Sequence, residues 1–251
     1  MITELRSSLF NACFFGVCML FGLATSLALP LPRCATQWSF RLWVRAVLWL
    51  SRVIVGLDYE VRGEEHIPGG GAVFASKHQS AWDVGIFHVV TKDPAYVLKK
   101  ELLLIPFYGW TLRKAAMIDI DRAGGASELK RMVRKAGQVL AGGRGIIIFP
   151  QGTRIAPGER RPYHPGVAAL YARTSAPVVP VALNSGYFWG RRSFLKYPGV
   201  ITIEFLPPMP EGLDRRSFMA ELEARIETAS ERLTCEAAAK YPRRAASVPA
   251  P

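Results

Sequence analysis

A long apolar run lies near the N-terminus of the chain and contains no charged residue from Leu9 to Leu29. At ~1.5 Å per residue, a helix of this length covers roughly the 30 Å core of a bilayer. Pro30 and Pro32 end such a helix, because proline lacks the backbone donor and disfavours helical geometry in the residue before it. The pattern predicts an apolar helix that spans a membrane or lies in it.

A second apolar segment follows, from Trp38 to Ile54, and it is rich in Trp, Leu and Val. At helical spacing Arg41, Arg45 and Arg52 fall within about one 40° sector, which is typical of an interfacial helix with one cationic stripe. The two segments together predict a membrane-associated hairpin. Arg33 and the later arginines favour the inner (cytoplasmic) cell membrane with the main domain on the cytoplasmic side, since cytoplasmic flanks carry the excess of Lys and Arg.

The N-terminal run has two other interpretations. A cleaved signal peptide would use Ser26-Leu27-Ala28 as its cleavage region. However, Glu4 offsets the charge of Arg6, so the residues before the apolar run lack the positive charge of a signal peptide, and the apolar run is long for one. A buried core helix rarely stays uncharged over such a length. The hairpin is therefore the preferred hypothesis, and the sequence leaves open whether its first helix crosses the bilayer or stays in one leaflet.

After Gly63, short apolar runs alternate with helical stretches, and glycine or proline stands at the joins. This alternation predicts an α/β fold with a largely parallel central sheet flanked by helices. In the last helix Phe218, Leu222, Ile226 and Leu233 share one face, which predicts a closing amphipathic helix. The predicted strands are 71–76, 95–98, 115–120, 145–149, 178–182 and 200–205, and the predicted helices are 81–90, 127–141, 167–174 and 217–239.

The composition narrows the choice of partners. Half of the 251 residues are hydrophobic and 21% are charged, which excludes a disordered chain. The formal net charge of +12 attracts anions, whether nucleic acid, anionic lipid or a phosphorylated substrate. The apolar N-terminus favours the membrane, and no stretch interleaves basic and aromatic residues as nucleic-acid platforms do. We expect membrane lipids as partners and no nucleic acid.

His78 and Asp83 lie where a predicted strand ends and a predicted helix begins. Active groups often lie at this carboxyl edge of a sheet. A histidine accepts a proton from an alcohol near neutral pH, and a carboxylate on the far ring nitrogen fixes its tautomer. However, Ser80 followed by Asp83 also fits a capping box, in which Asp83 satisfies helix amides and His78 is only a polar strand end. The spacing alone does not separate the two interpretations.

Basic residues follow three other predicted strands. The segment Gln151-Gly152-Thr153-Arg154 comes directly after an apolar strand, where a glycine turn leaves backbone amides free to face an anion and an arginine can grip a phosphate. Lys99 and Arg122 follow two more strands. Cations at successive strand ends would converge on one pocket beside His78, which suits an anionic substrate. The alternative is an ordinary turn with solvated side chains.

Several common catalytic signatures are missing from the sequence. It has no Gly-x-Ser-x-Gly elbow, no P-loop and no dinucleotide fingerprint, so a reaction through a serine-bound intermediate is not supported. The four cysteines form no Cys-x-x-Cys pair and no metal-ligand spacing with the histidines. The cysteines are therefore expected to be reduced, inert packing residues.

Five motifs in a fixed order resemble the 1-acylglycerol-3-phosphate acyltransferase family in its bacterial form. The order and spacing make the resemblance specific, and it covers roughly residues 59–208. The membrane-inserted helix pair is also similar to bacterial members. The motifs are His78-x4-Asp83, Lys99-Lys100-Glu101-Leu102 with Ile105-Pro106-Phe107-Tyr108-Gly109, Ile120-Asp121-Arg122, Phe149-Pro150-Gln151-Gly152-Thr153-Arg154 and Val179-Pro180-Val181-Ala182.

The resemblance implies transfer of a fatty acyl group to the sn-2 hydroxyl of 1-acylglycerol 3-phosphate, a lysophosphatidic acid, which gives phosphatidic acid. It assigns His78 as general base and Asp83 as the residue that orients it. It also implies that no metal and no bound cofactor takes part, and that acyl-CoA or acyl-ACP (acyl carrier protein) is the co-substrate. Segment 179–182 would help to shape the acyl site. The implied residues of the phosphate pocket are Lys99, Arg122, Gly152, Thr153 and Arg154.

The expected organisation is a membrane-associated hairpin (1–58), an acyltransferase catalytic domain (59–240) and a disordered tail (241–251). One departure concerns Gln151, where the family usually has Glu: an amide keeps the hydrogen bonding but lacks the negative charge. Two alternative functions stay open, namely acylation of another lysolipid and lipid binding without catalysis. The acyl chain length, the choice of donor and the oligomeric state are not determined by the sequence.

Overall fold

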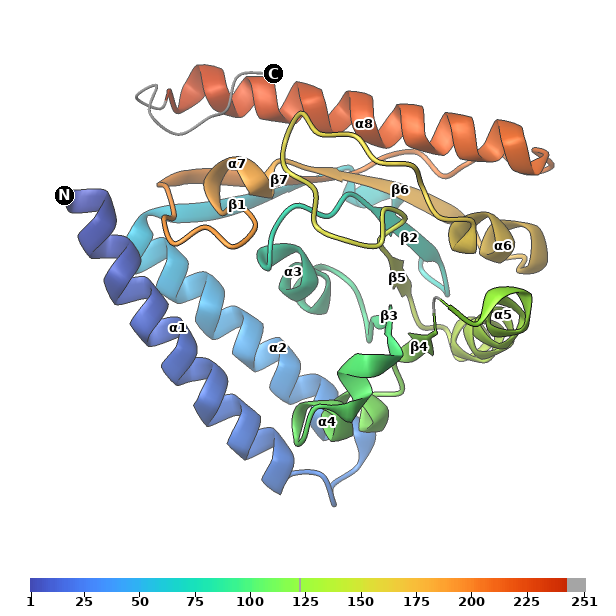
Figure 1. The fold of residues 1–251 in the computed structure, drawn as a ribbon, viewed down its shortest axis with the longest axis horizontal. Coiled ribbons are helices and arrows are strands. Elements are labelled where there is room, and N and C mark those ends of the chain that lie inside the picture. Colours follow the sequence, from blue (N-terminus) through green and yellow to red (C-terminus); the bar gives the residue numbers. More distant parts are fainter. Residues whose placement is uncertain (122, 243–251) are drawn as a thin grey trace.

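A seven-stranded sheet lies at the centre of the molecule in this computed structural model, which describes residues 1–121 and 123–242 (Figure 1). The strand order is β1-β7-β6-β2-β5-β3-β4. Every neighbouring pair is parallel except β6 with β7, which is antiparallel. The strands are β1 (Leu57–Arg62), β2 (Val73–Ser76), β3 (Ala95–Lys99), β4 (Ile118–Ile120), β5 (Ile146–Ile148), β6 (Val178–Leu183) and β7 (Gly199–Phe205).

The predicted fold class is confirmed, and each of the six predicted strands is present with its ends shifted by three residues or fewer. The sequence interpretation missed β1, which pairs with β7 in parallel, Tyr59 opposite Ile201. This edge strand carries Asp58 and Glu60 and is mostly half-buried, so it lacks the apolar run that marks the central strands. The expected boundary at residue 58 falls inside β1.

Helices cover both faces of the sheet (Figure 1). In β2 the side chain of Phe74 packs with the face covered by α1, α2 and α3, whereas Val73 and Ala75 pack with the face covered by α5, α6 and α8. This alternation follows from the two-residue period of a strand. The helices are α1 (Ile2–Leu27), α2 (Arg33–Leu50), α3 (Trp82–Val90), α4 (Tyr108–Lys114), α5 (Gly125–Ala141), α6 (Gly166–Arg173), α7 (Ser185–Phe188) and α8 (Arg215–Lys240), with helical turns η1 (Ser51–Val55), η2 (Glu64–His66) and η3 (Lys100–Leu104).

The closing helix α8 buries the face that its sequence predicts. Phe218, Leu222, Ile226 and Leu233 are all fully buried, which confirms the amphipathic pattern. The helix begins after Asp214, whose carboxylate accepts hydrogen bonds from the backbone N–H groups of the first turn. Of the predicted disordered tail, residues 243–251 lie outside the described part of the chain.

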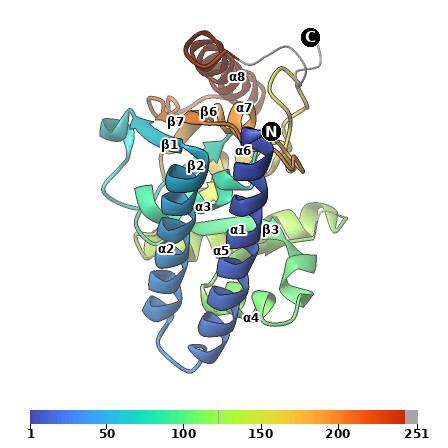
Figure 2. The same cartoon turned by 90° about the vertical axis from the view of Figure 1, so that its left-hand side faces the viewer.

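The first two helices form the predicted hairpin, and Figure 2 shows α1 and α2 side by side. The hydroxyls of Thr25 and Ser39 lie 2.9 Å apart between them. At the other end of α1, the Nζ atom of Lys196 donates to Asn11 Oδ1 at 2.6 Å, which ties the hairpin to the main domain. Among the described helices, α1 is the one long and apolar enough to cross a membrane, and only 11% of its most apolar window is buried.

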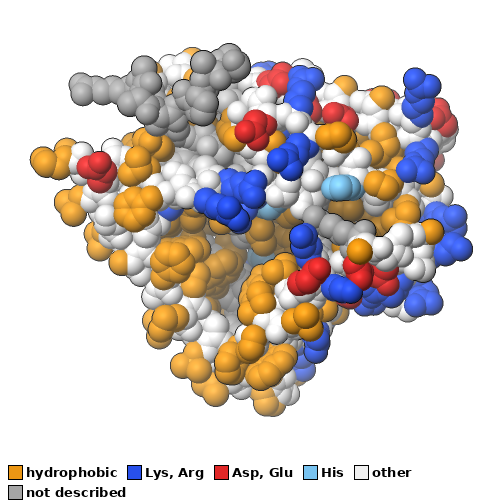
Figure 3. All heavy atoms as spheres, in the orientation of Figure 1, with side chains coloured by type: hydrophobic (Ala, Val, Ile, Leu, Met, Phe, Trp, Pro, Cys, Tyr) orange, Lys and Arg blue, Asp and Glu red, His pale blue; other side chains and the backbone are white. Residues whose placement is uncertain are grey.

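The exposed apolar surface of the hairpin continues onto α4 and the turn before it. Figure 3 shows apolar side chains gathered over the regions of α1 and α4. The sequence interpretation missed α4, because its residues 108–114 mix polar and apolar types. A continuous apolar surface of this kind fits membrane association. The exposed residues include Leu9, Phe15, Met19, Leu23, Trp38, Trp49, Leu104, Phe107 and Trp110.

Candidate active site

The predicted site residues converge because the strands that carry them are neighbours. His78 follows β2, the turn 151–154 follows β5 and Lys99 ends β3, and these three parallel strands lie next to one another in the sheet. A cleft of about 320 Å³ is lined by His78, Lys99, Gly152, Thr153 and Arg154 together with apolar side chains. Arg122, the remaining predicted cation, lies outside the described residues. Segment 179–182 lies in β6 and does not line this cleft.

His78 and Asp83 form a direct hydrogen-bonded pair. Nδ1 of His78 lies 2.9 Å from Oδ2 of Asp83, and the carboxylate is fully buried whereas the imidazole remains partly accessible at the cleft. Because an ionised carboxylate only accepts hydrogen bonds, Nδ1 carries the proton, and Nε2 keeps a free lone pair. The imidazole ring also stacks on Phe149, with the ring centroids 4.0 Å apart, which fixes its plane. The pair therefore has the geometry of an oriented general base.

Asp83 also binds backbone amides, as the capping alternative predicted, but these amides belong to the turn before α3 and not to the helix itself, whose N-cap residue makes no side-chain cap. This contact is compatible with the pairing to His78. Oδ2 of Asp83 accepts from the backbone N–H groups of Gln79 at 2.6 Å and Ser80 at 2.7 Å. The hydroxyl of Ser185 donates to Oδ1 at 2.5 Å. These donors satisfy the oxygen atoms of a carboxylate that is out of contact with water. Ser185 escaped the sequence interpretation because it is 102 residues away along the chain.

A second histidine, His88, lines the same cleft but has a different environment. Burial, together with the nearby charge of Arg41, lowers the pKa of His88 to about 4. Its ring lies between those of Phe40 and Tyr96, with centroid distances of 5.2 and 5.3 Å. His88 is therefore neutral at physiological pH and forms part of an aromatic wall of the cleft.

The turn after β5 presents an arginine to the cleft. Gly152 has a φ of +67°, in the left-handed region that favours glycine, and its N–H donates to the carbonyl of Phe149 at 2.8 Å. The guanidinium of Arg154 makes no ion pair with any carboxylate of the described chain. A second cation supports the turn, since Arg191 donates to the carbonyl oxygen of Arg154 at 3.2 Å. The turn can therefore receive an external anion.

A buried ionic network lies behind these residues and has no counterpart in the sequence interpretation. Nζ of Lys77, the neighbour of His78, contacts the two carboxylate oxygens of Glu227 on α8 at 2.9 and 2.6 Å. The hydroxyl of Tyr163 and the amide of Gln151 also donate to Glu227, at 2.9 and 3.3 Å. All four side chains are buried. The network joins the strand end that carries His78 to the turn that carries Arg154.

The fold and the cleft thus define an α/β enzyme class in which a histidine–carboxylate pair faces a cationic cleft with apolar walls. A family model described as Acyltransferase matches residues 58–184. A 1-acyl-sn-glycerol-3-phosphate acyltransferase from Pseudomonas aeruginosa is 35% identical over 229 residues, which cover 90% of this chain and 89% of the relative. This chain belongs to the acyltransferase family, and the family membership predicted from the motifs is confirmed.

More distant relatives agree with this membership. The human protein 1-acyl-sn-glycerol-3-phosphate acyltransferase alpha is 30% identical over 174 residues, which cover 68% of this chain and 62% of that protein. The crystal structure of the 1-acyl-sn-glycerophosphate (LPA) acyltransferase PlsC from Thermotoga maritima superimposes with a TM-score of 0.75 at 20% identity. The superposition covers 93% of this chain and 98% of that one, so the two share their fold.

Proposed function

We propose that this protein transfers a fatty acyl group from an acyl thioester to the sn-2 hydroxyl of 1-acylglycerol 3-phosphate and so forms phosphatidic acid. The observation that carries the proposal is the oriented His78–Asp83 pair in a cleft that also holds Lys99 and Arg154. The names of the relatives support lysophosphatidic acid as the acceptor. In this proposal residues 59–240 are the catalytic domain and the hairpin holds it at the membrane.

His78 would act as general base in a direct transfer. Its Nε2 takes the proton from the acceptor hydroxyl as the oxygen attacks the thioester carbonyl, and Asp83 stabilises the imidazolium that forms. When the tetrahedral intermediate collapses, the carbon–sulfur bond breaks and the proton passes from His78 to the leaving thiolate. Holding both substrates in one cleft contributes on the order of several kcal/mol through orientation.

Arg154 and Lys99 would bind the phosphate of the acceptor, with Gly152 and Thr153 shaping the turn. We expect Arg154→Gln to raise the KM for lysophosphatidic acid by about ten-fold to a hundred-fold, because a charged hydrogen bond contributes roughly 1.5–3 kcal/mol. Steady-state kinetics with varied acceptor measures this change. The matched control is Arg173→Gln, which removes an equal charge from the exposed end of α6. Equal KM values for wild type and Arg154→Gln would contradict this role.

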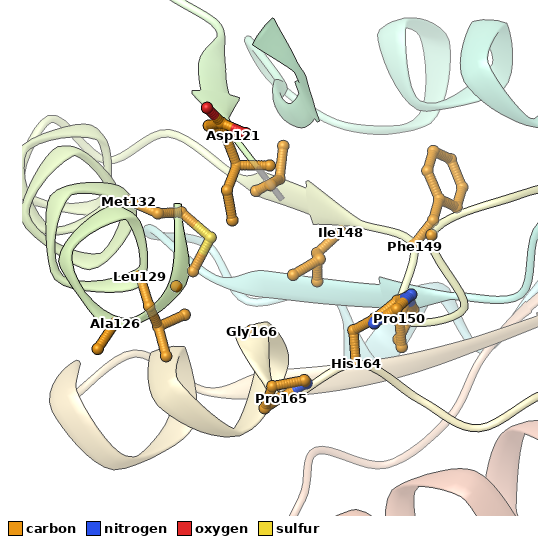
Figure 4. Close-up of a pocket in the computed structure, with 14 residues that line it drawn as sticks. Asp121, Ala126, Leu129, Met132, Ile148, Phe149, Pro150, His164, Pro165 and Gly166 are labelled. Atoms are coloured by element: carbon orange, nitrogen blue, oxygen red, sulfur yellow. The ribbon is translucent and has the colours of Figure 1, made fainter. Parts of the chain in front are cut away.

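An apolar cavity of about 440 Å³ adjoins the cleft and shares Val97, Phe149 and Gly152 with it. Figure 4 shows its walls: Leu129 and Met132 come from α5, and His164, Pro165 and Gly166 lie opposite them at the start of α6. We place the transferred acyl chain here, because the cavity opens beside the reacting groups and its walls are mainly apolar.

Filling this cavity should shorten the acyl chain that the enzyme accepts. In Leu129→Trp the larger ring occupies the space between α5 and α6, so the ratio of kcat/KM for long-chain over short-chain thioesters should fall by about ten-fold or more. Competition between the two thioesters gives this ratio directly. Lys130→Leu, which adds an apolar side chain at the next position of α5 without lining the cavity, should leave the ratio unchanged. A ratio unchanged in Leu129→Trp would place the chain elsewhere.

The acceptor would enter laterally from the membrane. A second apolar cavity, of about 280 Å³, lies between α1, α2 and α4, and it shares Phe40, Trp43 and Tyr108 with the cleft. This continuity gives a lipid tail an apolar route from the hairpin to the reacting groups. In this proposal the catalytic domain lies on the cytoplasmic side, where acyl-CoA and acyl-ACP are available.

The deciding experiment measures acyl transfer to lysophosphatidic acid in membranes with each donor, acyl-CoA and acyl-ACP. Lysophosphatidylcholine serves as the competing acceptor. Phosphatidic acid as the main product supports the proposal, and the donor that gives the higher rate identifies the thioester. Acylation of lysophosphatidylcholine alone would assign another acceptor, and no product from any pair would favour lipid binding without catalysis.

A further inference from the structure

A second basic hollow lies on the opposite edge of the sheet from the catalytic cleft. Its volume is about 410 Å³, and it is lined by Phe74 of β2 and by Gly145, which precedes β5. These residues lie at the amino ends of the strands, whereas the catalytic residues follow the carboxyl ends. The other walls come from α2, from the end of α3 and from the segment between β1 and β2. The hollow is therefore separate from the proposed active site.

Three cations line this hollow: Arg41 and Arg45 of α2, and Lys92 just after α3. None of the three forms an ion pair within the described chain, and no lining residue is acidic. The nearest acidic neighbour in sequence, Asp93, is already paired with Arg33 at 2.8 Å and with Arg144 at 3.2 Å. The hollow therefore holds positive charge that no carboxylate of the described residues balances.

The structure holds Arg41 in place and leaves room beside the three cations. Nε of Arg41 donates to the carbonyl oxygen of His88 at 3.0 Å, which fixes the guanidinium against α3. Across the hollow, Gly69 and Gly70 have open space where a side chain would begin, and so does Gly143. A bulky anionic group can therefore approach the backbone on this side without meeting side chains.

The position of the hollow relative to the exposed apolar surface suggests where the anion comes from. On α2, Trp38 and Trp49 are 65% and 62% exposed, and at helical spacing their row runs directly beside the row of Arg41 and Arg45. If the tryptophans enter the interface of the membrane, the arginines stand at the level of the phosphates. In Figure 2 the segment that follows β1 lies on the side of α2 away from α1, and residues 67–70 of this segment line the hollow.

We propose that this hollow binds the phosphate of an anionic phospholipid headgroup at the membrane surface, at a site distinct from the catalytic cleft. Arg41, Arg45 and Lys92 supply the charge, and the glycines of the facing segment admit the headgroup. A lipid bound there fixes the rotation of the hairpin about its axis, so that the cleft faces the bilayer from which the substrate arrives. The proposal does not depend on the reaction, because the headgroup need not be an acceptor.

Vesicle sedimentation tests the proposal on the full chain. Wild type is compared with Arg45→Gln, Lys92→Gln and the double variant on phosphatidylcholine vesicles with and without phosphatidylglycerol. Arg45 and Lys92 are exposed and form no hydrogen bond or ion pair with another described side chain, so their replacement should preserve the fold. The affinity for the anionic vesicles should fall about five-fold for each charge removed, and binding to phosphatidylcholine alone should not change.

The matched control is Arg52→Gln. Arg52 shares one face of the second hairpin segment with Arg41 and Arg45 but does not line the hollow, and its Nε lies 3.2 Å from Asp58. Its replacement by glutamine removes one positive charge, as Arg45→Gln does. It should leave the affinity for anionic vesicles within about two-fold of wild type. A loss equal to that of Arg45→Gln would show that only the general surface potential acts, and would overturn the site. Equal losses on both vesicle types would overturn it as well.

A soluble probe separates a lipid headgroup from free phosphate. Dihexanoyl phosphatidylglycerol should raise the melting temperature of wild type, and the double variant should lose this shift although its catalytic cleft is intact. Inorganic phosphate at the same concentration should have no comparable effect. If inorganic phosphate reproduces the shift, and the double variant loses it, the hollow is a site for free phosphate and the assignment to a lipid is wrong.

Discussion

Replacement of His78 by alanine is expected to lower kcat by about a hundred-fold to ten-thousand-fold, because the acceptor hydroxyl then loses its general base. The fold should persist, since the imidazole is at the cleft surface and its hydrogen bond goes to Asp83. Without His78, Asp83 keeps donors from Gln79, Ser80 and Ser185. Acyl transfer from a labelled thioester, at matched amounts of folded protein, measures the loss.

Two further variants test whether the loss of activity is specific to the His78–Asp83 pair. Asp83→Asn keeps the shape of the side chain but can no longer hold the required tautomer of His78, and it should lower kcat by up to about ten-thousand-fold. His66→Ala removes a histidine that binds the carbonyl of Phe205, remote from the cleft, and should keep most of the activity. Full activity in His78→Ala would refute the proposed mechanism, whatever the behaviour of the other variants.

Glu227→Leu is expected to lower the free energy of unfolding by about 3–5 kcal/mol, because it leaves the charge of Lys77 buried without a partner. Lys77 and Glu227 are only 3% and 4% exposed, so water cannot replace the lost carboxylate. Activity should fall as well, since Lys77 precedes His78 and Gln151 begins the turn that carries Arg154. Denaturant unfolding in detergent measures the stability.

The double variant Lys77→Met/Glu227→Leu is the control for this effect. It removes both charges together, so most of the stability lost in the single variant should return. Glu231→Gln, one turn further along α8, breaks an exposed pair with Arg160 and should change stability far less. A double variant as unstable as Glu227→Leu would mean that the loss comes from packing and not from the unpaired charge.

The network also gives a physical reason for an amide at position 151, where the family resemblance implies a glutamate. The amide of Gln151 donates to Glu227 at 3.3 Å, and α8 thus supplies a buried carboxylate next to this turn. A second carboxylate at position 151 would lie against the first in a buried site, which is costly unless one of them is protonated. The amide is therefore more compatible with Glu227 than a second carboxylate would be, although its own Oε1 has no hydrogen-bond partner among the described residues.

Local patterns in the sequence were sufficient for much of the fold. The uncharged N-terminal run, the apolar strands and the periodic face of α8 are each visible in residues close together in the chain. Such apolar runs and faces are removed from water in any fold, so they predict the element that carries them. The edge strand β1 and the short helix α4 lack such runs. Their structure depends on pairing with β7 in one case and on packing beside the hairpin in the other.

The sequence by itself determined the family and the hairpin, and it predicted His78, Asp83 and Arg154 as site residues, because each of these signals depends on residues close together in the chain. Only the tertiary structure decided that β2, β5 and β3 are neighbours, that Ser185 supports Asp83, that Glu227 neutralises Lys77, and that a basic hollow opens beneath α2. These contacts join residues far apart in the chain. No local sequence pattern specifies these contacts. They follow from the order of the strands in the sheet and from the packing of helix and sheet faces against each other.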